Sequence, residues 1–124
     1  MKKILPLLFL LMAVPLMGQK FQPAFKSGEW LKFRIHYGLL NASYATLHLS
    51  SETLDSIPVY HVVGTGKTTG FASIFFKVDD TYESYFGRRN GKPYKFIRKI
   101  DEGGYTKDIE INFDYNEKKA VLKD

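Results

Sequence analysis

The sequence predicts a mainly β protein whose strands form one antiparallel meander sheet. Three observations support this fold class. Apolar and polar residues alternate along several segments, and this period is typical of strands that bury one face. Short turns that contain glycine, asparagine or aspartate separate these segments. Aromatic residues make up 15% of the chain and there is no cysteine, so we expect an aromatic core without disulfides.

The first two predicted strands are residues 28–38 and 43–50, which both alternate cleanly. If their apolar faces coincide, Phe33 lies opposite Leu47. Residues 38–42 then form a five-residue hairpin loop.

The middle of the chain is predicted to add a third strand at 59–66, rich in β-branched residues, and a fourth at 77–87. Turn residues at 54–58 precede the third strand. Between the third and fourth strands, apolar residues stand at helical spacing, so we expect one short helix at 71–76.

Residues 93–115 predict a hairpin around the two-residue turn Gly103-Gly104. This turn places Phe96 opposite Ile111. The apolar and polar faces of both strands agree with that register, which favours this pairing.

The sequence contains two further turn signals. Asn90-Gly91 predicts another hairpin, and residues 116–124 turn again and begin a further strand. An unfinished last strand leaves an open sheet edge, and exposed edges promote aggregation. We therefore expect an incomplete domain, or a sheet covered in a way that the sequence does not reveal.

Residues 1–18 have the layout of a secretory signal peptide, in which Lys2 and Lys3 precede an apolar run. Residues 19–27 are then an N-terminal extension, and 28–124 the N-terminal part of the antiparallel β domain. A retained anchor is the alternative, but the run is short for a membrane span of about 20 residues. We expect a soluble, exported protein of the bacterial periplasm or cell envelope, with no transmembrane segment after cleavage. Without cysteine it has no lipid anchor on that residue, and nothing indicates its oligomeric state.

Residues 62–71 resemble the end of a phosphate-binding loop because they contain Gly66-Lys67-Thr68. The first glycine of that motif would fall at His61, inside a predicted strand, and no long helix follows. We therefore interpret the stretch as a strand that ends in a glycine-rich loop. The net charge is +5, but the only adjacent basic residues after the predicted signal peptide are two pairs at turns. We therefore expect no nucleic-acid partner.

The three histidines do not predict a metal site. In the register given above, His36 and His48 are about 13 Å apart, too far to share an ion. His61 can approach only one of them, and no cysteine or paired acid supplies further ligands.

The acidic residues Asp79, Asp80 and Glu83 resemble a hydrolytic or calcium-binding cluster. On a strand, however, Asp80 points away from the other two. We expect Glu83 to pair with Lys99 or Arg98 on the next strand. No Gly-x-Ser-x-Gly motif is present, so we expect no catalytic residue, no cofactor and no enzymatic activity.

The stretches "FKSGEWLKFRIHYG" and "ASYATLHL" resemble the opening signature of a family of exported bacterial proteins, domain of unknown function 3108. Phe33, Ile35 and Ser43 depart from the family pattern. Residues 79–86 and 102–105 also resemble its later strands. The positions that agree with the opening pattern are Phe25, Gly28, Glu29, Leu31, Tyr37, Gly38, Ala42, Ala45 and Leu47.

This resemblance implies a strongly curved, half-barrel-like antiparallel sheet, similar to that of lipoprotein carriers. It also implies a domain longer than the present chain. The family has no established activity, so no site residue is transferred from it, and the comparison with lipoprotein carriers is an analogy of fold alone.

Apolar residues of several strands are expected to line one face of the sheet. An ordinary packed core is one interpretation of this face. The other is a half-barrel whose concave face binds a lipid or other amphiphile, with 71–76 as a lid. The residues of this candidate ligand face are Phe33, Ile35, Leu47, Leu49, Tyr82, Phe86, Phe96, Ile109, Ile111 and Phe113.

The leading functional hypothesis is therefore a non-enzymatic envelope protein that binds an apolar or amphiphilic component. A structural protein that pairs with an envelope partner through an open sheet edge is the second. A protein that interacts with a cell-wall polysaccharide is the third, since Trp30 and Tyr44 on the polar face have the aromatic rings that stack on sugars.

Overall fold

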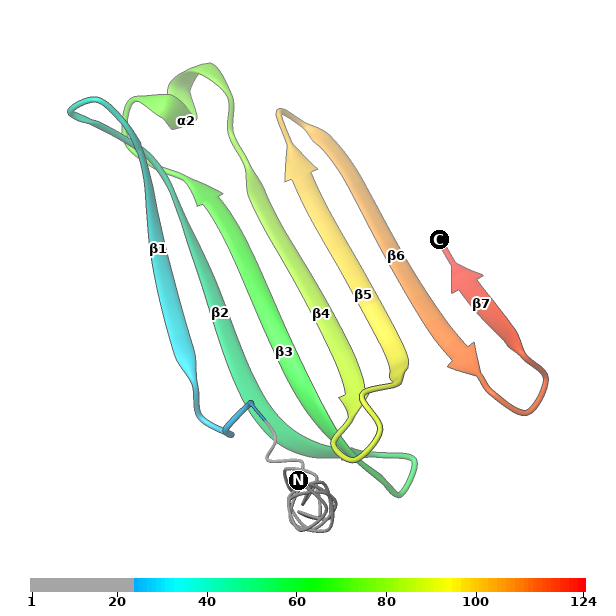
Figure 1. The fold of residues 1–124 in the computed structure, drawn as a ribbon. Helices are drawn as coiled ribbons and strands as arrows, with labels where there is room; N and C mark the ends of the chain where they lie inside the picture. Colours follow the sequence, from blue (N-terminus) through cyan, green and yellow to red (C-terminus); the bar gives the residue numbers. More distant parts are fainter. Residues whose placement is uncertain (1–23) are drawn as a thin grey trace, which may run out of the picture.

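Seven antiparallel strands lie side by side in one sheet, in the order of the chain (Figure 1). The computed structural model describes residues 24–124. The predicted signal peptide, and residues 19–23 of the predicted extension, lie outside the described residues. The strands are β1 Trp30–Tyr37, β2 Leu40–Leu54, β3 Ile57–Thr68, β4 Asp79–Gly87, β5 Pro93–Glu102, β6 Tyr105–Asp114 and β7 Lys119–Lys123.

The predicted fold class is confirmed. Each strand pairs with the next one in sequence, and the sheet is not closed, since β1 and β7 are its two edges. One short helix, α2 (Ala72–Phe75), connects β3 to β4, where a helix at 71–76 was expected. In the described part of the chain, no helix has the length and apolar character needed to cross a membrane.

The predicted register of the first hairpin is wrong by two residues. Phe33 lies opposite Ala45, and Leu47 faces Leu31. The connection is a tight turn at Gly38, which has a φ of +57°, in place of a five-residue loop. A shift of two keeps every side chain on its predicted face, so the apolar pattern could not distinguish the two registers.

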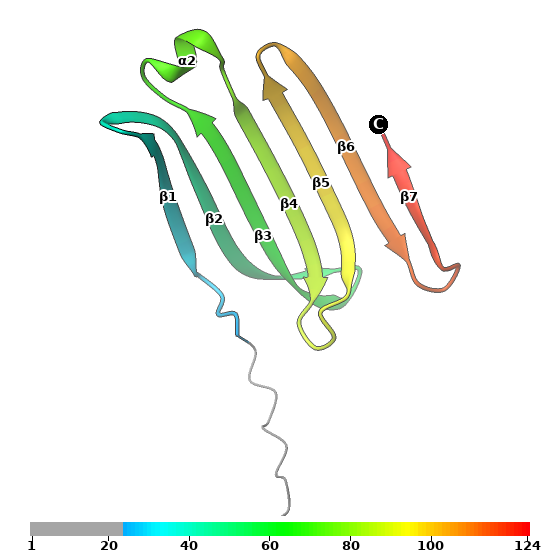
Figure 2. The ribbon, with the colours of Figure 1, turned by 45° about the horizontal axis from the view of Figure 1, so that its top comes forward.

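The hairpin β2–β3 is longer than predicted, because it closes at Asp55-Ser56. Both residues have positive φ, as a type I′ turn requires. Its closed end passes behind β4 and β5 (Figures 1 and 2). The stretch Gly66-Lys67-Thr68 belongs to β3, so the predicted glycine-rich loop is a continuous strand.

The second predicted hairpin is confirmed in detail. Phe96 lies opposite Ile111, across the turn at Gly103-Gly104. Asn90-Gly91 does lie in a hairpin, but its loop spans residues 88–92. The β4–β5 register also shifts beside Tyr85.

The core of the described region is thin. Leu49, Val59, Tyr60 and Ile100 are its only buried hydrophobic residues. Around Tyr60 an aromatic cluster forms, in which Phe25 packs at 6.2 Å between ring centroids and Phe86 at 5.6 Å. The sheet therefore has one well-packed end and much exposed apolar surface elsewhere.

Gly103→Ala is expected to lower the free energy of unfolding by about 1–3 kcal/mol. Gly103 has a φ of +60°, which strains any L side chain, and an added Cβ would lie 2.6 Å from the Phe76 ring. Gly70→Ala is the matched control, because Gly70 has a φ of +55° and open space around its Cβ position. Chemical denaturation measures both. Equal losses in the two variants would contradict a role for the Phe76 contact.

Candidate functional site

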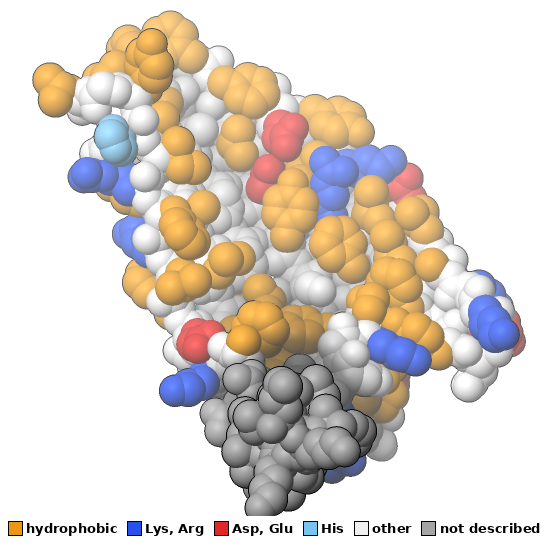
Figure 3. Space-filling model, in the orientation of Figure 1, with side chains coloured by type: hydrophobic (Ala, Val, Ile, Leu, Met, Phe, Trp, Pro, Cys, Tyr) orange, Lys and Arg blue, Asp and Glu red, His pale blue; other side chains and the backbone are white. Residues whose placement is uncertain are grey.

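The strand pairing places all ten residues of the predicted ligand face on the same side of the sheet. Tyr82, for example, lies opposite Gly64 on one neighbouring strand, and Gly64 in turn lies opposite Leu47. Hydrophobic side chains spread across the strands on this side (Figure 3). We call this side the apolar face; it carries Phe33, Ile35, Leu47, Leu49, Tyr82, Phe86, Phe96, Ile109, Ile111 and Phe113.

The apolar face is only partly covered in the described region. Phe33 and Ile35 on β1 are about half exposed, at 49% and 52%, and Leu47 is 42% exposed. Leu49 is buried, whereas the residues on β5 and β6 are half-buried. Monomeric proteins rarely leave a large contiguous apolar patch uncovered without a binding role.

A shallow hollow of about 430 Å³ lies on the apolar face. Gly64 and Gly66 form part of its floor, since neither places a side chain there, and Phe33, Leu47 and Tyr82 line it. An added Cβ at Gly66 would meet nothing within 4 Å. The hollow thus exists because β3 carries two glycines, two residues apart, on this face.

The sequence analysis did not identify these two glycines as site residues. Two glycines spaced by two in a run of β-branched residues were the available signal, since such a pair removes two side chains from one face of a strand. The helix α2, expected as a lid, contributes no residue to the hollow. It lies at the end of the sheet where β3 ends and β4 begins (Figure 1).

Charged side chains also lie on the apolar face. Arg98 pairs directly with Tyr82 and is half-buried, and its Nε–H is buried without an acceptor among the described residues. Asp80, 7% exposed, also lines the hollow, and its Oδ1 accepts a hydrogen bond of 3.2 Å from the Asp101 N–H. Lys107 pairs with Asp124 at 2.8 Å.

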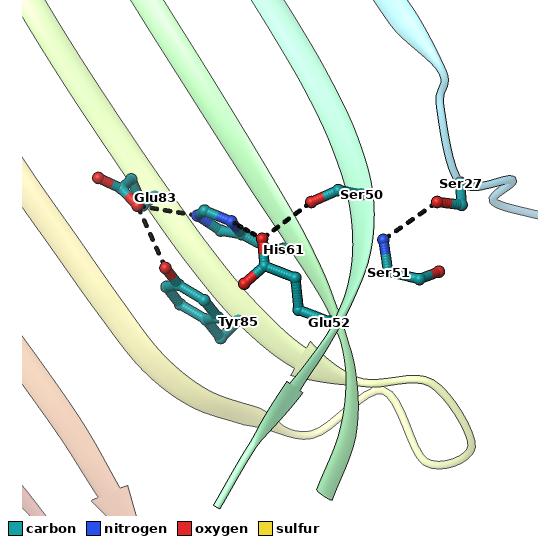
Figure 4. Close-up of polar contacts among 7 residues, drawn as sticks. All are labelled: Ser27, Ser50, Ser51, Glu52, His61, Glu83 and Tyr85. Atoms are coloured by element: carbon teal, nitrogen blue, oxygen red, sulfur yellow. Dashed lines mark hydrogen bonds and ion pairs between the residues drawn. The ribbon is translucent and has the colours of Figure 1, made fainter.

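The opposite side, the polar face, carries a hydrogen-bonded cluster centred on His61 (Figure 4). Its Nδ1 lies 2.8 Å from Glu52 Oε1 on β2, and its Nε2 lies 2.8 Å from Glu83 Oε2 on β4. Tyr85 stacks on the imidazole at 4.0 Å and donates its hydroxyl to Glu83 over 3.4 Å. The cluster therefore links β2, β3 and β4 through hydrogen bonds.

Both ring nitrogens of His61 thus lie within hydrogen-bonding distance of a carboxylate oxygen. The hydrogen bond from His61 lowers the pKa of Glu52, and Ser50 adds a weaker contribution. Burial, followed by the nearby Glu83 carboxylate, raises the pKa of Tyr85. Both imidazole nitrogens are engaged, so His61 has no free nitrogen for a substrate or a metal.

The predicted partner of Glu83 is wrong. Glu83 lies opposite Ile97 and bonds to His61, while Lys99 lies opposite Thr81. The β3–β4 register, which the sequence did not specify, brings His61 within reach from the other side.

The other acidic and histidine side chains considered as site residues do not form a cluster. Asp79 pairs with Lys67 at 2.8 Å, on the face opposite that of Asp80. His36 Nδ1 lies 3.1 Å from the Gly38 carbonyl, and His48 is opposite Trp30. Within residues 24–124, no three His, Cys, Asp or Glu side chains come together as metal ligands.

The polar face has the larger hollow, an open groove of about 800 Å³. Leu54 and Ile57, at the closed end of β2–β3, form one side of it, and Lys95 and Asn112 line the other. The bent hairpin therefore contributes to a groove whose volume exceeds that of the hollow on the apolar face.

Trp30 and Tyr44, considered for sugar stacking, lie on the polar face as expected from their alternation. Trp30 is 57% exposed. The Lys32 ammonium lies 4.6 Å from the centroid of the Tyr44 ring, so one side of that ring is occupied.

Comparison with known proteins gives one match. The model of a family described as protein of unknown function (DUF3108) matches residues 32–124, which include all seven strands except the first two residues of β1. Neither the curated proteins nor the solved structures include a significant match to this chain. The match covers well over half of the sequence, and the chain therefore belongs to the DUF3108 family.

Proposed function

We propose that this chain is a non-enzymatic, exported envelope protein that binds an apolar or amphiphilic molecule in the hollow of its apolar face. The observation that carries the proposal is the hollow itself, a glycine-floored space of about 430 Å³ among partly exposed apolar side chains. Its volume lies within the range of roughly 300–1,000 Å³ typical of small-molecule sites.

Apolar burial supplies the driving force in this proposal. Each methylene of a ligand that leaves water contributes about 0.8 kcal/mol. Phe33, Leu47 and Tyr82 are each more than a third exposed, so a ligand would also remove part of their surface from water. A chain of several carbons can therefore outweigh the entropy lost on binding.

The export part of the proposal rests on the N-terminal sequence. Residues 1–18 have the charged start and short apolar run of a cleaved signal peptide. N-terminal sequencing of the protein recovered from a periplasmic extract tests this, and a mature chain that begins at Gln19 is the expected result. A protein that retains Met1 in the membrane fraction would contradict it.

Gly66→Leu is expected to weaken the binding of a fluorescent fatty-acid analogue at least about tenfold, because the new side chain fills the hollow. The backbone of Gly66 tolerates the change, since it is extended strand and a Cβ there meets nothing within 4 Å. Thr106→Leu adds a leucine to the polar face of β6 and is the matched control. Fluorescence titration measures both variants.

Unchanged affinity in Gly66→Leu would place the ligand elsewhere. Native mass spectrometry of the protein purified from the envelope complements the titration, and a bound mass that extracts into organic solvent is the expected result.

A second candidate function is the capture of a protein partner at β1. All eight residues of this edge strand are exposed, and its outer edge pairs with no other strand in the described region. Such an edge can accept a strand from another chain. In the same native mass spectrum, a bound polypeptide in place of a lipid would favour this candidate.

A further inference from the structure

We propose that Arg98 recognises the carboxylate headgroup of a single-chain amphiphile whose hydrocarbon lies in the hollow of the apolar face. This inference rests on the proposed function and specifies its ligand as an anion of the fatty-acid type. Four features of the apolar face support it: the position of Arg98, its lack of a partner, the charge of its neighbours and the layout of the hollow.

Arg98 lies beside the hollow. It pairs directly with Tyr82, which lines the hollow from β4, and with Ile109 on its other side. Directly paired residues of antiparallel strands have Cβ atoms about 5 Å apart. A headgroup at Arg98 can therefore continue into a chain that passes Tyr82 and lies over Gly64 and Gly66.

The guanidinium of Arg98 has no protein acceptor within the described residues. Its Nε is buried and forms no hydrogen bond, and no carboxylate of residues 24–124 lies within 4.0 Å of the group. Lys107, the other base on this face, is paired with Asp124 at 2.8 Å. A partly buried, unpaired cation among apolar side chains is unfavourable, and an anionic ligand removes that cost.

The neighbouring charges favour a headgroup with a single negative charge. Asp80 lines the same hollow, and among residues 24–124 its carboxylate accepts one hydrogen bond, from the Asp101 N–H. One guanidinium can balance one carboxylate and bind it through two parallel hydrogen bonds. A phosphate dianion would leave excess negative charge near Asp80, so we expect a carboxylate to bind more tightly than a phosphate ester.

The test is a series of dodecyl compounds, used below their micellar concentrations and titrated into the mature protein by calorimetry. The series consists of dodecanoate, dodecyl phosphate, dodecanol and dodecyltrimethylammonium. We expect dodecanoate to bind most tightly. Arg98→Met should weaken dodecanoate binding about 10- to 100-fold, the range expected for a lost charge-assisted contact. It should leave dodecanol binding within about twofold.

Lys99→Met is the matched control, because it removes the same charge from the adjacent residue, whose side chain lies on the polar face. Arg98→Lys retains the charge without the planar fork and should bind with intermediate affinity. Arg98→Met should fold at least as well as the natural chain, since it removes a buried donor that has no acceptor. Circular dichroism and thermal melting check this.

The outcomes separate the two proposals. If no dodecyl compound binds the natural chain, both the hollow as a binding site and the role of Arg98 are overturned. If dodecanol binds as tightly as dodecanoate, or if Arg98→Met weakens dodecanoate no more than Lys99→Met does, the hollow remains a binding site and the role of Arg98 is overturned. Tighter binding of dodecyl phosphate than of dodecanoate would overturn the choice of a carboxylate.

Discussion

Replacing Tyr60 with alanine is expected to lower the free energy of unfolding by about 3–5 kcal/mol, the usual cost of truncating a buried aromatic residue. Tyr60 is 5% exposed and contacts Phe25 and Phe86. Its hydroxyl donates to the Phe25 carbonyl over 3.2 Å, and the Arg88 guanidinium lies 5.4 Å from its ring centroid. With so few buried residues, the loss of one leaves little to stabilise this end of the sheet.

Two variants make the Tyr60 experiment specific. Tyr60→Phe keeps the ring and removes the hydroxyl, so it should cost about 1 kcal/mol. Tyr37→Ala removes the same atoms from a residue that is 87% exposed and should change stability by less than about 0.5 kcal/mol. Urea denaturation measures all three. A loss below about 1 kcal/mol in Tyr60→Ala would show that the aromatic cluster does not stabilise the fold.

The faces of the sheet could be predicted because strand alternation depends only on neighbouring residues. Every residue assigned to the apolar face lies there, even on β1 and β2, where the predicted register was wrong by two. The register itself depends on the turn. At Gly103-Gly104 the two-glycine turn agreed with both faces, whereas the alternation before and after Gly38 also fitted a longer loop.

The His61 cluster could not be predicted because it depends on two registers at once. Glu52, His61 and Glu83 come from three strands, and they meet only when both β2–β3 and β3–β4 are aligned. Charge patterns alone favoured a lysine or arginine as the partner of Glu83. The network therefore requires three-dimensional information, whereas the glycine pair beneath the hollow was visible in the sequence.

The two faces thus have different physical roles. The polar face joins neighbouring strands through ion pairs such as Lys95 with Glu110 at 3.1 Å, and through the His61 cluster. The apolar face has exposed side chains, the glycine-floored hollow and Arg98, whose Nε–H has no acceptor within residues 24–124. Cross-strand polar contacts help to hold an open sheet together.

His61→Leu is expected to lower the free energy of unfolding by about 2 kcal/mol at neutral pH. The substitution removes both hydrogen bonds to carboxylates and leaves Glu83, whose side chain is 22% exposed, without this hydrogen-bond partner. The Glu52 side chain is 43% exposed, so solvent screening makes its share small. His48→Leu is the matched control on an exposed histidine that forms no polar side-chain contact within the described region.

The effect of His61→Leu should also depend on pH, in a direction that the Glu52 contact determines. The hydrogen bond from His61 lowers the pKa of Glu52 below 4.5. A carboxyl group with a lowered folded-state pKa stabilises the fold fully above its unfolded value, and this contribution is lost as the pH falls through the folded value. The part of the difference between the natural chain and His61→Leu that comes from Glu52 should therefore shrink as the pH falls from about 5 toward about 3. Urea denaturation across this range measures it, and a difference that persists unchanged in acid would show that the contacts of His61 do not depend on ionised carboxylates.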